Sequence, residues 1–234
     1  MAADVHTAVA FYATPMGARA GALVAERLSR RWPDLRAARV LGLGFAPPYL
    51  RIWREQGAQC FAAIPGQVGI ARWPEGGPNL SCTVAEDALP FADLGFDRVL
   101  LVHGLEAAEN ARRLLREVWR VLRDDGRLLV VAPNRMGMWA HVETTPFGHG
   151  QPYSPGQIGR LLTSSMFRVE WRDTALYMPP LRPAFRAGRA WDQVGRRLAP
   201  RFAGVTITEA VKDVYAVIPA GPARTRRLVL SAST

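Results

Sequence analysis

The stretch LLREVWRVLRDDGRLLVVAPN, residues 114–134, decides the fold class. Its first half carries apolar residues at helical spacing and predicts an amphipathic helix over Ala107–Arg123, ended by Asp125-Gly126. Its second half, Arg127–Pro133, is a short continuous apolar run, which is typical of a parallel strand covered on both faces. A helix that leads directly into such a strand predicts an α/β protein.

The same alternation of helices and strands extends over the whole chain. Cap-plus-proline signals predict a helix from Thr14-Pro15 to about Arg31 and another from Ser154-Pro155. Further helices are expected near Tyr49–Gln56 and around 185–198. The expected strands are Ala38–Gly44, Gln59–Ile64, Leu80–Ala85, Asp97–His103, Arg127–Pro133, Phe167–Tyr177 and Val205–Val217. This pattern predicts a doubly wound, seven-stranded, mostly parallel sheet in three layers, with an antiparallel pair at one edge.

The composition of the chain limits which partners and which cellular location are expected. The formal net charge is +10, and nearly all of it is arginine, since Lys212 is the only lysine. A basic surface attracts phosphate, so RNA or an acidic protein partner stays open as an interpretation of this charge. The alternative is a GC-rich coding bias, which raises the arginine count without a selected function. The chain lacks the long apolar run of a membrane span and the pattern of a secretory signal. Cys60 and Cys82 fit two buried thiols, and a cytoplasmic location is expected.

Three segments resemble the class I methyltransferases that depend on S-adenosylmethionine (SAM), most closely the small-molecule type. They are the strand and glycine turn at Val40–Gly44, the segment EDALPFADLGFDRVLLVHGLE at Glu86–Glu106, and the helix, Asp-Gly turn and strand at Leu114–Asn134. The resemblance implies the Rossmann-like methyltransferase fold, with SAM at the carboxyl ends of the first four strands. It also implies methyl transfer to a small-molecule acceptor by alignment and exclusion of water.

The resemblance also implies a domain plan. One methyltransferase-like domain is expected over residues 1–219, with a helical lid over 1–35 and a substrate loop over 134–155. Residues 220–234 are expected to form a loose tail.

Carried over position by position, the family's cofactor contacts fall on nine residues. They are Gly42, Gly44, Phe45, Ala46, Ile64, Glu86, Asp87, Ala88 and His103.

Two acids of the family pattern are absent, so the cofactor motif is degenerate. Gly42 stands where the acid of the first strand is expected, and the second strand ends in Ala63-Ile64-Pro65 without the acid that takes the ribose hydroxyls. The loss of one such acceptor costs on the order of 1–3 kcal/mol, or about tenfold to a hundredfold in affinity. The departures therefore argue against ordinary SAM binding.

Candidate catalytic and substrate residues follow from position as well. His103 comes after the fourth strand and is interpreted either as a general base or as a hydrogen-bonded structural residue. The candidates for substrate binding are Tyr12, Asn134, Arg135, Trp139 and His149. For Tyr12 and Trp139 a purely structural role, in the lid and in anchoring the loop, stays open. The spacing of His141 and His149 matches no metal pattern, so no metal is expected.

The sequence is compatible with three alternative functions. The first is an active SAM-dependent methyltransferase with a divergent cofactor loop. The second is a catalytically inactive protein of the same fold that acts as a binding or regulatory partner. The third, supported by charge alone, is an RNA-associated protein of this fold.

Overall fold

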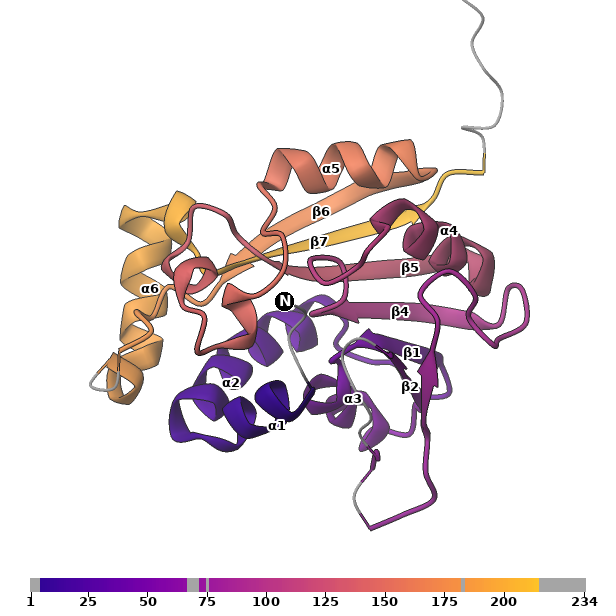
Figure 1. The fold of residues 1–234 in the computed structure, drawn as a ribbon, viewed down its shortest axis with the longest axis horizontal. Coiled ribbons are helices and arrows are strands. Elements are labelled where there is room, and N and C mark those ends of the chain that lie inside the picture. The colour runs from indigo at the N-terminus through magenta and orange to yellow at the C-terminus, as the bar shows by residue number, and fades with distance from the viewer. Residues whose placement is uncertain (1–4, 67–71, 75, 182–183, 215–234) are drawn as a thin grey trace, which may run out of the picture.

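The computed structural model describes residues 5–66, 72–74, 76–181 and 184–214. These residues build one seven-stranded sheet with the order β3-β2-β1-β4-β5-β7-β6 (Figure 1). The strands are β1 (Arg39–Gly44), β2 (Gln59–Pro65), β3 (Ser81–Val84), β4 (Phe96–Val102), β5 (Leu122–Pro133), β6 (Phe167–Ala175) and β7 (Val205–Lys212). Strands β1 to β5 are parallel, whereas β7 runs antiparallel to both β5 and β6. The predicted sheet is confirmed.

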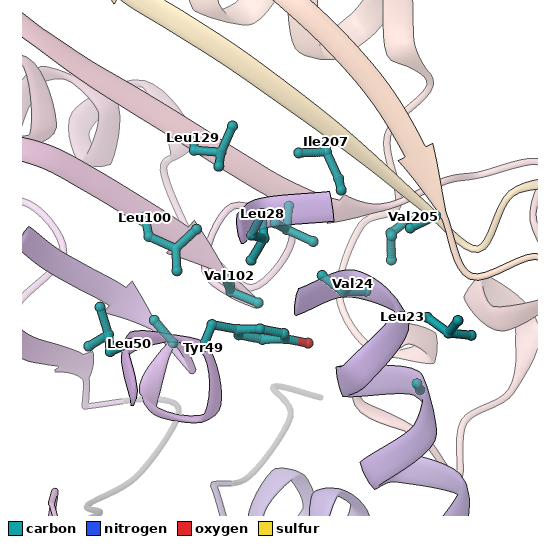
Figure 2. Packing of buried hydrophobic residues seen from close by; sticks show 14 of the residues in the cluster. Leu23, Val24, Leu28, Tyr49, Leu50, Leu100, Val102, Leu129, Val205 and Ile207 are labelled. Carbon is teal, nitrogen blue, oxygen red and sulfur yellow. The ribbon is translucent and has the colours of Figure 1, made fainter. Parts of the chain in front are cut away.

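Helices cover both faces of the sheet, as the continuous apolar strands require. They are α1 (Val5–Ala13), α2 (Pro15–Arg31), α3 (Pro47–Arg54), α4 (Ala111–Val121), α5 (Pro155–Ser164) and α6 (Gly188–Leu198). On one face, α2 and α3 pack against the strands, with Leu28, Leu50 and Leu100 in a single buried cluster (Figure 2). On the other face, α4 and α5 contribute Leu114, Val118 and Leu162 to a second cluster. Burial on both faces explains why the strands read as unbroken apolar runs.

The two predicted helix starts are confirmed at atomic detail. The Thr14 side chain accepts a hydrogen bond from the backbone N–H of Gly17 at 3.0 Å, and Pro15 begins α2. Ser154 and Gln157 form a reciprocal capping box at the start of α5. Each cap satisfies backbone donors that the first turn of a helix leaves unpaired.

The helix expected over Ala107–Arg123 is shorter than predicted. It begins at Ala111, because the Glu86 carboxylate holds the preceding loop by accepting the backbone N–H groups of Glu109 and Asn110 at 3.2 and 2.9 Å. It ends at Val121, and Asp125-Gly126 lies within β5 rather than at the end of the helix. The pairing of β4 with β5 shifts register between Phe96 and Arg98, and this irregularity accommodates the polar turn residues inside the strand.

The expectation that both cysteine thiols are buried is confirmed for Cys60 and wrong for Cys82. Cys60 is buried, and burial raises the pKa of its thiol to about 12. Cys82 is exposed, because β3 is the edge strand of the sheet. The tail expected over 220–234 and the end of the strand expected to reach Val217 lie outside the described residues. Within the described ranges, no helix is both long and apolar enough to span a membrane.

Candidate functional site

His103 occupies the carboxyl end of β4, at the point where the strand order reverses. Its side chain is 4% exposed, and its backbone adopts φ +50° in the left-handed region. Such a backbone is uncommon for a residue other than glycine and persists when the surrounding structure holds it in place. The imidazole is therefore fixed in position by the fold.

A chain of buried hydrogen bonds runs through this imidazole. The Nδ1 atom of His103 lies 3.1 Å from Oε1 of Glu106, and Nε2 lies 2.8 Å from the hydroxyl of Tyr12. The Tyr12 hydroxyl in turn lies 2.9 Å from that of Tyr49. We assign the imidazole proton to Nδ1, where a carboxylate oxygen accepts it, and this assignment leaves Nε2 to accept from the Tyr12 hydroxyl. This arrangement suits a general base aimed at a hydroxyl group.

Two polar atoms beside this chain have no partner among the described residues. They are Oε2 of Glu106, a residue that is 4% exposed, and Nε2 of His149. The chain segment that follows His149 lies against Glu106, because the N–H of Gln151 donates to the Glu106 carbonyl at 2.8 Å. Buried polar atoms without partners are uncommon in folded proteins and indicate a place where water or a ligand binds.

Tyr12 closes the site from the side of the N-terminal helix. Its ring stacks on that of Phe45, with centroids 5.6 Å apart and planes at 22°. Burial, together with the neighbouring Tyr49, raises the pKa of Tyr12 well above that of free tyrosine, so its hydroxyl keeps its proton at neutral pH. On the outer side of this stacked pair lies an open cavity of about 850 Å³, lined also by Pro48, Ile52 and Trp73. Tyr12 thus lines this cavity and also contacts His103.

The turn after β1 has the shape of a cofactor loop but no space for its acid. Gly44 adopts φ +82°, and the N–H of Phe45 donates to the carbonyl of Val102 at 2.7 Å, which closes the turn onto β4. A Cβ at Gly42 would lie 2.6 Å from a methyl carbon of Leu50 and 2.7 Å from the Cβ of Ala46. The place of the family's first acid is therefore filled by α3.

Replacing Gly42 by alanine is expected to lower the free energy of unfolding by about 1–3 kcal/mol, because the added methyl overpacks the contact with Leu50. Urea denaturation measures the change. Gly66→Ala is the matched control, since its Cβ would meet Thr83 at an ordinary 3.7 Å. Equal stabilities of the two variants would contradict this packing.

The other cofactor positions are also engaged within the protein. Ile64 packs with Ala8 and Phe45 in a small apolar cluster, so it presents no acceptor for ribose hydroxyls. The Glu86 carboxylate accepts the backbone N–H groups in front of α4, and the exposed Asp87 lies 3.5 Å from Arg113. Ala88 makes a short bridge with Ala85. These four residues therefore all contact other parts of the protein in this arrangement of Tyr12 and Phe45.

The residues expected to bind substrate are placed unequally. The Asn134 amide donates to the carbonyls of Arg201 and Ala203, both at 2.9 Å, and the buried Trp139 donates to the carbonyl of Met178 at 2.6 Å. Both side chains thus hold the loop to the core, and Arg135 is exposed. Tyr12, in contrast, lies with His103, and Nε2 of His149 is buried without a partner among the described residues. Within the described ranges, no group of three or more residues of metal-ligand type is assembled.

Sequence reasoning missed three members of the site. Glu106 and Tyr49 complete the hydrogen-bond chain, and the ring of Phe147 packs edge-on against His103 with centroids 4.8 Å apart. Glu106 carried a usable signal, because it follows His103 by three residues in the turn after a strand.

Comparison with known proteins shows what the chain is similar to. Residues 21–130 match the family model described as a methyltransferase domain. Uncharacterised proteins of Mycobacterium tuberculosis and Mycobacterium bovis are 31% identical over 101 residues, which cover 40% of this chain and 35% of those proteins. The matched region is thus little more than a third of the length of these curated relatives.

Solved structures extend the likeness to the whole fold. A SAM-dependent methyltransferase from Mesorhizobium loti has a TM-score of 0.59 at 17% identity, over 80% of this chain and 98% of that one. A methyltransferase of Haloferax volcanii, solved with the activator Trm112, has a TM-score of 0.58 at 16% identity, over 80% and 88% of the two chains. The [4+2]-cyclase SpnF has a TM-score of 0.56 at 20% identity, over 81% and 80%. At these identities the likeness establishes the fold alone.

Proposed function

We propose that this chain, whose residues 21–130 match the methyltransferase-domain model, is a class I SAM-dependent methyltransferase that transfers a methyl group to an acceptor hydroxyl held against His103. The observation that carries the proposal is the buried series Glu106–His103–Tyr12, which ends on a hydroxyl group 2.8 Å from a ring nitrogen. The Tyr12 hydroxyl marks the position that an acceptor O–H would take. The proposal therefore requires α1 to withdraw Tyr12 before the reactants enter.

His103 is the proposed base in this arrangement. Its Nε2 receives the proton of the acceptor hydroxyl, while the Glu106 carboxylate holds the Nδ1 proton and stabilises the imidazolium that forms. Phe147 and Trp139 keep water away from the imidazole, because their rings pack together with centroids 5.4 Å apart beside it. The roles of base, orienting carboxylate and water-excluding rings thus all fall to residues of this chain, and none of them depends on how the methyl donor binds.

Calorimetric titration with SAM and S-adenosylhomocysteine tests the proposal. Because Tyr12 and Phe45 must separate first, we expect measurable binding that tightens when Tyr12 is replaced by alanine. Tyr49→Phe is the control, since it removes a hydroxyl from the same chain of hydrogen bonds without removing a ring from the stack. No heat at several hundred micromolar ligand from either the natural chain or Tyr12→Ala would overturn the methyltransferase proposal.

An acid introduced at Ile64 is expected to raise the affinity for SAM. Aspartate at this position offers the carboxylate that the end of β2 lacks, worth about tenfold to a hundredfold in affinity. The same titration measures the gain, and Ile64→Asn controls for loss of the apolar side chain without adding charge. Equal affinities of the aspartate variant and the natural chain would place the ribose elsewhere.

A further inference from the structure

The exposed apolar side chains of this protein gather at one end. Figure 1 shows α6 at that end of the molecule. Ten large apolar residues are exposed among the described residues, and seven of them come from 136–138 and 181–202. This apolar end comprises Met136, Met138, Leu181, Trp191, Val194, Leu198 and Phe202, which are 45–80% exposed.

Two segments form this apolar end, and hydrogen bonds join them. The Asn134 amide donates to the carbonyls of Arg201 and Ala203 at 2.9 Å, so the loop after β5 lies against the residues that follow α6. On α6 itself, Trp191, Val194 and Leu198 follow one another at spacings of three and four residues. That spacing places them along one side of the helix. The two segments of the apolar end therefore lie against each other.

The charges of this end are all positive where they face solvent. Four arginines of residues 188–202 are exposed, namely Arg189, Arg196, Arg197 and Arg201. The acid in this stretch, Asp192, is 6% exposed and lies 2.6 Å from the guanidinium of Arg27. The end thus combines protruding apolar side chains with basic groups, and its carboxylate is already neutralised.

We propose that this apolar end docks on the surface of an anionic phospholipid membrane. Trp, Phe and Leu side chains with arginine beside them suit the boundary between headgroups and acyl chains, where the long arginine stems reach the phosphates. A second copy of this chain is a poor occupant, because two such ends would bring eight arginines together. The inference does not depend on the methyltransferase proposal.

Sedimentation of the full chain with lipid vesicles tests the docking. We expect binding to an equal mixture of phosphatidylglycerol and phosphatidylcholine, and little binding to phosphatidylcholine alone. The Arg196→Gln/Arg197→Gln double variant is expected to bind about thirtyfold more weakly. The Trp191→Ser/Leu198→Ser double variant is expected to lose about tenfold or more, because apolar side chains no longer enter the bilayer.

Matched control variants distinguish vesicle binding through the apolar end from binding through the overall positive charge of the chain. Arg112→Gln/Arg116→Gln removes two exposed arginines from α4, and Leu94→Ser removes an apolar side chain that is 46% exposed on a turn that contacts α4. We expect both controls to bind vesicles like the natural chain. Equal weakening by the α4 and α6 arginine pairs would overturn the proposal. So would absence of binding to anionic vesicles at low salt, which would favour an acidic protein as the occupant.

Discussion

The His103→Gln protein is expected to lose methyl transfer by a factor of about 10²–10⁴, because glutamine cannot take up the proton of the acceptor. The assay follows S-adenosylhomocysteine released when the protein is given SAM and a panel of hydroxyl-bearing small molecules. Binding of S-adenosylhomocysteine is expected to change little, since the imidazole acts on the acceptor. Turnover equal to that of the natural chain would remove His103 from the reaction.

Glu106→Gln separates a positioning role from a catalytic one in the same assay. Its Oε1 orients the imidazole from 3.1 Å without touching the acceptor, so we expect a smaller loss than in His103→Gln. The glutamine can also present its amide N–H to Nδ1, which would favour the wrong tautomer, so the rate should depend on pH differently from that of the natural chain. An unchanged pH profile would show that Glu106 is purely structural.

Replacing Asp192 by alanine is expected to lower the free energy of unfolding by about 3–5 kcal/mol. One carboxylate oxygen lies 2.6 Å from Arg27, and the other accepts the backbone N–H groups of Leu176 and Tyr177 at 3.1 and 3.3 Å. Because Arg27 is only 6% exposed, the substitution leaves a buried guanidinium with a weaker partner, Asp173, 4.0 Å away. Chemical denaturation followed by tryptophan fluorescence measures the loss.

Two further variants make this expectation specific. Asp34→Ala removes an exposed carboxylate that also pairs with an arginine, Arg36, and is expected to cost far less stability than Asp192→Ala, because solvent screens the exposed pair. The double variant Arg27→Met/Asp192→Ala is expected to be more stable than Asp192→Ala alone, because it removes the buried charge as well. A cost at Asp192 no greater than at Asp34 would contradict the buried pair.

Much of the fold was predictable because its signals are local. Continuous apolar runs marked the strands, and Thr14-Pro15 and Ser154-Pro155 marked two helix starts that the structure confirms. The start of α4 was not predictable in this way, because the loop before it is held by Glu86, more than twenty residues away in sequence. Cys82 was misplaced since exposure at a sheet edge depends on strand order.

The candidate site shows the same division between local and distant signals. His103 was predictable from its position after the fourth strand, and the missing acids at Gly42 and Ile64 were readable directly. The contact between His103 and Tyr12 joins residues that are 91 positions apart in the sequence. The contact between Tyr12 and Tyr49 depends on how α1 lies relative to α3. Such contacts arise from tertiary packing and have no signature in a single sequence.

Histidine resonances in an NMR titration with S-adenosylhomocysteine test the central claim most directly. The chain has four histidines, and the spectrum of His103→Gln identifies the signal of His103. We predict that this signal shifts as ligand is added, because Tyr12 leaves its hydrogen bond with Nε2, while the signal of the exposed His141 stays in place. A His103 signal that does not move at millimolar ligand would contradict a cofactor site at the end of β4.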